Sequence, residues 1–154
     1  MAKVHHMRVP TNTATLAGFD PQRLRHRLGD RCAWWSIPAN EVQEITAGNL
    51  FSVGLGRDGV YRVAVHLYDT RPDTRAVSGL IRCDSGEVFI GAGEQIPGDG
   101  LEPDLAFGGL SLGATIGTYR VWVSRLGDFE LGVWLEETND EGRNQFRHGP
   151  SVDG

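Results

Sequence analysis

Glycine is the feature of this sequence that most restricts its fold. The chain has 21 glycines among 154 residues, about twice the average share, and they separate short apolar runs without a fixed period. Glycines spaced in this way are typical of many tight turns between short strands, which is the pattern of a β-sandwich or a small barrel. The lack of a fixed period argues against a repeat protein.

Length and composition predict a single domain over residues 1–154. Hydrophobic residues make up 40% and charged residues 23%, which are ordinary values for a folded domain with one hydrophobic core. No apolar run approaches the roughly 20 residues that cross a membrane, and the first residues lack the apolar centre of a signal peptide. We therefore expect a cytoplasmic protein with no membrane partner, and mobile termini at 1–10 and 140–154.

The formal net charge of −5 argues against a nucleic-acid partner, because such proteins need a basic face to neutralise phosphates. Residues 23–31 form a local basic cluster, which we interpret as a solvated helix face. Asp20 as a cap, Pro21 in the first turn and Gly29 at the end are the start and stop signals of a short helix over this cluster.

Alternating apolar residues predict three β-hairpins. The paired segments are 51–55 with 61–67, 76–83 with 87–91, and 119–123 with 131–135. Further strands are expected at 13–19 and 32–37. With the one short helix near the N-terminus, the pattern predicts an antiparallel β-sandwich of about eight strands, and a small β-barrel is the alternative.

Turn chemistry sets the expected register of the first two hairpins. A three-residue turn ending at Gly59 pairs Leu55 with Tyr61, which places the apolar residues of both strands on one face. A two-residue Ser-Gly turn in the second hairpin pairs Cys83 with Val88. Cys83 is then a buried structural thiol rather than a reactive one.

The third hairpin predicts an aromatic platform. If its turn is 126–128, Arg120 lies opposite Trp134 and Trp122 lies opposite Gly132, on the face that points away from the core. Aromatic and arginine side chains are the usual anchors of protein interfaces, so Trp122, Trp134 and Arg120 are candidate binding residues. The alternative is that another layer covers this face and makes the tryptophans part of the core.

The glycine- and proline-rich loop at 92–106 is the second candidate site. It carries four carboxylates, Glu94, Asp99, Glu102 and Asp104. They lack the order of a calcium-binding loop, and no histidines or cysteines have metal-site spacing, so we expect no metal and no cofactor. Beside a pocket, these carboxylates would be the polar groups of an enzyme or a small-ligand binder.

One stretch of the sequence resembles a family-level pattern. Residues 85–91, followed by Pro97-Gly98 and then by 117–121, are similar to the strands and turns of uncharacterised bacterial all-β proteins. The resemblance covers residues 76–124 and departs from the pattern before Gly117, where Ile116 stands in place of a proline. It implies a β-sandwich, and some small proteins of this kind act as binding or inhibitor partners of other proteins.

These observations favour a non-enzymatic protein of immunity or regulatory type. Its partner would be another protein or a second copy of itself. No G-x-S-x-G motif and no cysteine–histidine pair of recognisable spacing points to nucleophilic catalysis. The alternative is an enzyme or small-ligand binder with a pocket near the 92–106 loop.

Overall fold

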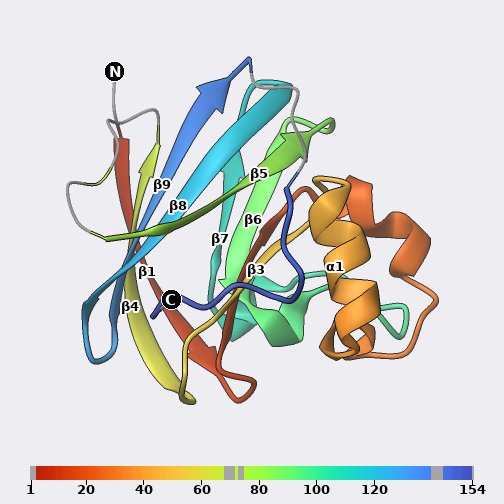
Figure 1. Ribbon diagram of the computed structural model, residues 1–154, viewed down its shortest axis with the longest axis horizontal. Helices are drawn as coiled ribbons and strands as arrows, with labels where there is room; N and C mark the ends of the chain where they lie inside the picture. Colours follow the sequence, from red (N-terminus) through yellow and green to blue (C-terminus); the bar gives the residue numbers. More distant parts are fainter. Residues whose placement is uncertain (1–2, 68–71, 73–74, 140–143, 154) are drawn as a thin grey trace.

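The computed structural model describes residues 3–67, 72, 75–139 and 144–153, and it confirms the β-sandwich (Figure 1). One sheet has five strands in the order β1-β4-β9-β8-β5, and the other has four in the order β3-β2-β6-β7. The strands of the described residues are β1 (Lys3–Thr11), β2 (Thr15–Phe19), β3 (Phe51–Gly54), β4 (Gly59–Leu67), β5 (Val77–Cys83), β6 (Glu87–Ala92), β7 (Leu110–Gly113), β8 (Gly117–Gly127) and β9 (Glu130–Thr138).

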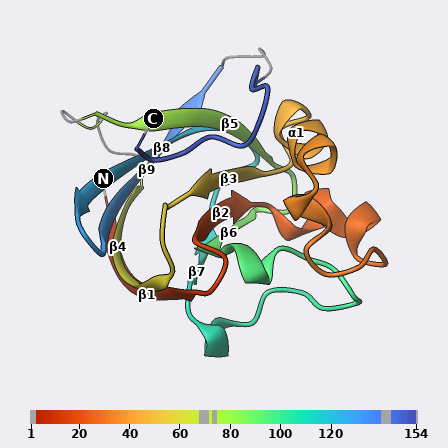
Figure 2. The ribbon, with the colours of Figure 1, turned by 60° about the horizontal axis from the view of Figure 1, so that its bottom comes forward.

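Most of the short helices lie beside the four-stranded sheet, on the right of Figure 2. The short helices are the 3₁₀ helices η1 (Pro21–Arg27), η2 (Trp34–Ser36), η3 (Gly93–Gln95) and η4 (Leu105–Phe107), and the α-helix α1 (Pro38–Thr46). The predicted helix after Asp20 is confirmed as η1. The buried Asp20 carboxylate accepts the N–H of Gln22 at 2.9 Å, and it also accepts the N–H groups of Asp84 and Ser85. One side chain therefore caps η1 and holds the turn that follows β5.

The basic cluster fixes η1 against α1. Arg27 Nε and His26 Nε2 lie 2.7 and 2.8 Å from Oε2 of the buried Glu44. Arg23 forms an ion pair of 2.8 Å with Asp84. The interpretation as a solvated helix face therefore needs correction, because two of its arginines bind carboxylates of neighbouring elements.

The first two predicted hairpins are wrong, because the chain passes from one sheet to the other at both turns. β3 pairs with β2, whereas β4 pairs with β1 and runs parallel to β9. β5 pairs with β8, and β6 pairs with β2 and β7. Leu55 does not pair with Tyr61, nor Cys83 with Val88; these side chains meet from opposite sheets in one core. Two strands that face the same core alternate in the same way as two strands of one hairpin.

The third hairpin is confirmed, with its register shifted by two residues. Trp122 lies opposite Trp134, and Arg120 lies opposite Glu136. An irregularity between Arg125 and Gly127 absorbs the extra residue. A shift of two keeps every side chain on its predicted face, because the side chains of a strand alternate with a period of two.

The strand predicted at 32–37 is wrong. The chain there forms a 3₁₀ turn, and both Trp34 and Trp35 are buried. They belong to a small cluster beside the main core, with Phe19, Leu24 and other apolar residues under η1. The Trp34 indole N–H donates to the carbonyl of Pro97 at 2.7 Å. A turn lets neighbouring tryptophans share one side, which a strand would not allow.

Both ends of the described chain are attached to the sheets. The segment expected to be a mobile N-terminus instead forms β1, which pairs along its whole length with β4. At the other end, Gly54 and Ser151 form a parallel bridge beside β3. Residues 140–143 and 154, which belong to the other predicted mobile end, lie outside the described residues.

Candidate protein-interaction groove

The two tryptophans of the third hairpin lie on the outer face of the five-stranded sheet. Trp122 is only 9% exposed, and Trp134 is half-buried with its ring stacked on His66, the centroids 4.8 Å apart and the planes at 5°. The predicted contact between Arg120 and Trp134 is replaced in the register by Arg120 opposite Glu136. This face therefore exposes less aromatic surface than the sequence predicts. The binding role of Trp122, Trp134 and Arg120 stays a prediction.

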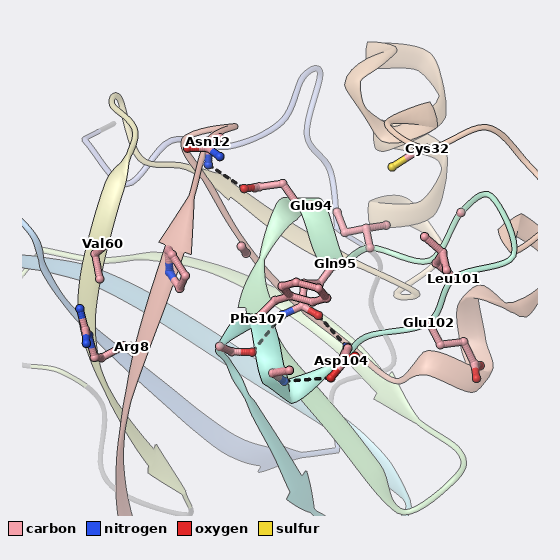
Figure 3. Close-up of a pocket in the computed structure, with 16 residues that line it drawn as sticks. Arg8, Asn12, Cys32, Val60, Glu94, Gln95, Leu101, Glu102, Asp104 and Phe107 are labelled. Atoms are coloured by element: carbon pink, nitrogen blue, oxygen red, sulfur yellow. Dashed lines mark hydrogen bonds between the residues drawn. The ribbon is translucent and has the colours of Figure 1, made fainter.

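A hollow in the surface lies beside the predicted 92–106 loop. It is a groove of about 760 Å³ between β1 and the segment 93–109, which carries η3 and η4 (Figure 3). Arg8 and Pro10 of β1 and Val60 of β4 line one side. The other side comes from the loop between β6 and β7. We call this hollow the groove throughout.

Glu94 holds the turn between β1 and β2 at one end of the groove. Its carboxylate accepts the hydroxyl of Thr11 at 2.8 Å, the backbone N–H of Asn12 at 2.6 Å and the hydroxyl of Thr13 at 2.5 Å. Burial raises the pKa of Glu94, but these donors outweigh burial and the pKa is lowered. Glu94 is thus an ionised carboxylate whose oxygens serve the fold.

Gln95, the next residue, braces the opposite wall. Its side-chain carbonyl accepts the N–H of Asp104 at 2.7 Å, and its amide donates to the carbonyl of Gly108 at 2.9 Å (Figure 3). Gly108 has φ of 91°, and a Cβ there would lie 2.7 Å from the carbonyl oxygen of Arg8. The segment can approach β1 so closely only with glycine at this position. Two adjacent side chains, Glu94 and Gln95, thereby fix the turn at one end of the groove and the loop that forms one wall.

The braced wall exposes large apolar side chains. Leu101 is 69% exposed and Phe107 is 68% exposed, and both line the groove. Leu105 between them is also exposed, but it lines a neighbouring hollow with Pro21. Phe107 follows the Asp104 cap of η4, where Asp104 Oδ1 accepts the N–H of Ala106 at 2.9 Å. The helix η4 is therefore a short capped turn that presents Phe107 at the groove.

The groove continues past β1 and β4 into a second hollow. Arg8 and Val60 line both, and the second adds Arg62 and Phe129. Phe129 is 39% exposed, and the guanidinium of Arg57 lies 4.5 Å from its ring centroid. Val60 is 45% exposed. The two hollows form one surface that carries aromatic rings at both ends.

The structure brings three of the four loop carboxylates to the groove. Glu94, Glu102 and Asp104 line it, whereas Asp99 does not. Asp99 has a positive φ of 51°, and its N–H donates to the carbonyl of Asp30. Sequence reasoning missed Phe107, Leu101, Val60 and Arg8. The available signal was the apolar triplet at 105–107 inside a loop that is otherwise rich in glycine, proline and acid.

The described part of the chain contains neither a candidate metal site nor a helix that could cross a membrane. Among those residues, no group of three or more histidine, cysteine, aspartate or glutamate side chains could hold a metal ion. No helix in the same part is long and apolar enough to cross a bilayer.

Comparisons with known proteins agree with the fold. The product of crocagin biosynthetic gene J superposes with a TM-score of 0.58 at 15% identity, over 90% of this chain and 99% of that one. ComJ from Bacillus subtilis, an inhibitor of the DNA degrading activity of NucA, superposes with a TM-score of 0.52 at 10% identity, over 88% and 96%. No curated protein matches. The model of a family of unknown function, DUF6386, matches residues 1–148, so the chain belongs to that family.

Proposed function

We propose that this protein binds another protein and restrains it, as an immunity-type or regulatory partner without enzymatic activity. The observation that carries the proposal is Phe107, exposed at 68% on a wall that Gln95 holds in place. Contiguous apolar side chains held in water by a braced loop mark interaction surfaces. An aromatic ring beside a depression is the usual form of an interface hot spot.

The likeness to ComJ supports this reading. ComJ has the same fold and inhibits the DNA degrading activity of another protein, NucA. At 10% identity this likeness carries no residue-level role to the present chain. It supports the proposal only in that ComJ, a protein of this fold, serves as an inhibitor.

The charge of the chain favours a basic partner. Its net charge is −5, and an enzyme that grips DNA needs a cationic face for the phosphates. Opposite charges on two proteins speed their encounter and select the right partner. A DNA-degrading enzyme is accordingly the first class of partner to test.

A small-molecule site is the second candidate, because the volume of the groove, about 760 Å³, lies in the range of ligand pockets. The carboxylate chemistry fits this candidate less well. A general acid at neutral pH needs a raised pKa, whereas the pKa of Glu94 is lowered by its three donors.

The proposal is tested by affinity capture from an extract of the cells that make this protein. The baits are the wild type, Phe107→Asp, and Ile116→Ala, a matched control at an exposed apolar residue of the turn between β7 and β8. Circular dichroism first establishes that all three are folded. We expect one protein to be retained by the wild type and by Ile116→Ala, to be lost with Phe107→Asp, and to lose its activity when the wild type is added.

Other results of the same experiment would count against the proposal. If all three baits retained the partner equally, the groove would have no role in binding it. A Trp134→Ala bait that loses the partner while Phe107→Asp keeps it would assign binding to the outer face of β8 and β9. A retained protein whose activity the wild type leaves unchanged would contradict restraint.

A further inference from the structure

The five-stranded sheet leaves part of one edge open. β1 is its outermost strand, at the lower end of the sheet in Figure 2, and residues 3–7 of this strand are exposed or half-buried. We propose that this stretch pairs with the same stretch of a second copy of the chain, antiparallel and about a two-fold axis at His5. The pairing goes beyond the proposed function and uses none of the residues that line the groove.

Two hydrogen bonds show which backbone groups of β1 point away from β4. Arg62 of β4 lies opposite Arg8, but it donates its N–H to the carbonyl of Phe129 at 2.9 Å, on the β9 side. The carbonyl of Arg8 accepts the N–H of Gly109 at 3.1 Å from outside the sheet. Arg8 and Arg62 are therefore a non-hydrogen-bonded pair. Because this direction alternates along a strand, the N–H and C=O groups of Val4 and His6 also point outward.

The remainder of this edge is covered by the chain itself. Besides the bond from Gly109, a Cβ at Gly108 would lie 2.7 Å from the carbonyl oxygen of Arg8 and 2.8 Å from Cδ of Pro10. Residues 108–109 therefore lie against β1 from Arg8 onward. The stretch of β1 that remains for an incoming strand is 3–7.

The outer edges of β5 and β3 are also covered. Asn144 binds the N–H and the carbonyl of Leu80 in β5, and the strand β3 is bound at Gly54 by the carbonyl of Pro150 and the N–H of Val152. Such cover matters because a row of open N–H and C=O groups is a template for another strand. At residues 4 and 6 the described part of the chain supplies no such cover. This stretch therefore has the form of a strand-docking edge.

The open stretch is complementary to itself, which favours a second copy as the occupant. With His5 opposite His5 of the second copy, Val4 lies opposite His6 of that copy, and His6 lies opposite its Val4. Both of these are hydrogen-bonded pairs, so the two N–H and two C=O groups that each copy leaves open satisfy one another. The segment 108–109 of each copy lies beyond this pairing.

The side chains agree with the same register. Lys3 is the single lysine, arginine, aspartate or glutamate in 3–7, and it falls opposite Met7 of the second copy rather than opposite another lysine. Its hydrocarbon stem can cover Met7, which is half-buried and packs against the main core. Val4, 47% exposed, gains a cross-strand neighbour in His6. A short pairing of this kind buries less surface than a permanent dimer does, so the dimer exchanges with the monomer.

The first test is sedimentation equilibrium over a wide range of protein concentrations. His6→Pro removes an outward N–H and no bond to β4, as Pro10 already does in the same strand. His6→Ala, the matched control, loses the side chain and keeps the N–H. We expect the wild type and His6→Ala to dimerise, and the dissociation constant of His6→Pro to rise by at least about tenfold. A wild type that is monomeric throughout, or a dimer that His6→Pro leaves intact, would overturn the proposal.

A cross-linking test keeps the proposal falsifiable if His6→Pro does not fold. It uses a Cys32→Ser background, which removes the exposed thiol, while the native Cys83 is buried. In the proposed register the two copies of residue 5 form a non-hydrogen-bonded pair about 4.5 Å apart at Cα, a distance that a disulfide can span. His5→Cys should therefore form a disulfide-linked dimer in a mild thiol–disulfide buffer. Val4→Cys, whose two copies are not opposite each other, should form much less, and equal cross-linking of both would contradict the register.

Amide hydrogen exchange separates a second copy from a foreign strand. Raising the concentration of this protein alone should slow exchange at the amides of Val4 and His6 and leave Leu80, already bound by Asn144, unchanged. Protection of residues 4 and 6 that appears only after a different protein is added would assign the edge to that protein and overturn the proposal. Because residues 3–7 do not line the groove, neither result decides the proposed function.

Discussion

Glu41 and Glu44 lie one turn apart on α1, yet the pKa values of their carboxyl groups move in opposite directions. Burial raises the pKa of both. At Glu44, donors from Asn49, His26 and Arg27 outweigh burial and lower the pKa. At Glu41 the hydroxyl of Ser52 donates at 2.7 Å, but this donor does not outweigh burial, and the pKa is raised. The number of donors thus decides whether burial or hydrogen bonding sets the direction of each pKa shift.

Replacing Glu44 should destabilise the protein in a pH-dependent way. The folded pKa lies below the ordinary 4.5, so the contribution of the carboxylate is present above that pH and is lost as the pH falls through the folded value. Glu44→Gln should lower the free energy of unfolding at neutral pH by about 2 kcal/mol, because Arg27 loses its buried partner. Urea unfolding across the acid range measures this. A deficit that stays constant down to the lowest pH would contradict the account, and Asp58→Asn in an exposed turn is the control.

Replacing Glu41 should change the free energy of unfolding with the opposite dependence on pH. Its folded pKa lies above 4.5, so its contribution is present below that pH and is lost as the pH rises through the folded value. Glu41→Gln keeps an acceptor for Ser52 and removes the charge. The variant should equal or exceed the wild type at neutral pH, by about 0.5 kcal/mol, and lose this advantage in acid. Destabilisation at neutral pH in urea melts would count against it.

Asn144 should be a major support of the C-terminal segment. Its amide accepts the N–H of Leu80 at 2.7 Å and donates to the carbonyls of Leu80 and Ile45. The side chain thus closes the outer edge of β5 and ties it to α1. Asn144→Ala should cost about 2 kcal/mol, because three buried backbone groups lose partners. Asn139→Ala, at an exposed position, should change the unfolding free energy by less than about 0.5 kcal/mol. Equal urea midpoints for the two variants would refute this role.

The sequence predicts those parts of the fold that local chemistry decides. Asp20 caps η1 as expected, and the faces of Tyr61, Val63 and Trp122 are correct even where their pairing is not. Alternation reports which side of a strand is buried, but it does not report which sheet the strand joins. A short turn that crosses between sheets leaves the same pattern as a hairpin. Both incorrect hairpins arise from this ambiguity.

The candidate site follows the same division. Composition locates the 92–106 loop, and a groove lies beside it. The residues that shape the groove depend on contacts far apart in sequence, such as the donation from Asn12 to Glu94 and that from Gly109 to Arg8. The exposure of Phe107 also depends on such contacts. From the sequence alone, an apolar residue in a loop cannot be told from the single apolar residues that are common on protein surfaces.

Gln95 should control binding through the shape of the groove that it lines, because its buried amide braces the wall that carries Phe107. Gln95→Leu leaves the N–H of Asp104 and the carbonyl of Gly108 without this partner. We expect faster amide hydrogen exchange at 104–108 and about tenfold weaker binding of the captured protein, measured by calorimetry. Gln22→Leu, at an exposed residue of η1, should change neither quantity. Unchanged affinity with loosened exchange would show that wall rigidity is irrelevant to binding.

The most direct measurement is amide hydrogen exchange of this protein with and without the captured partner, read by mass spectrometry. The account predicts slower exchange at 101–109 and at 59–62 on β4, the two sides of the groove, and no change at the turn of Ile116. Slower exchange at 118–124 and 130–138, with the groove unchanged, would place the partner on the tryptophan hairpin and contradict the central claim.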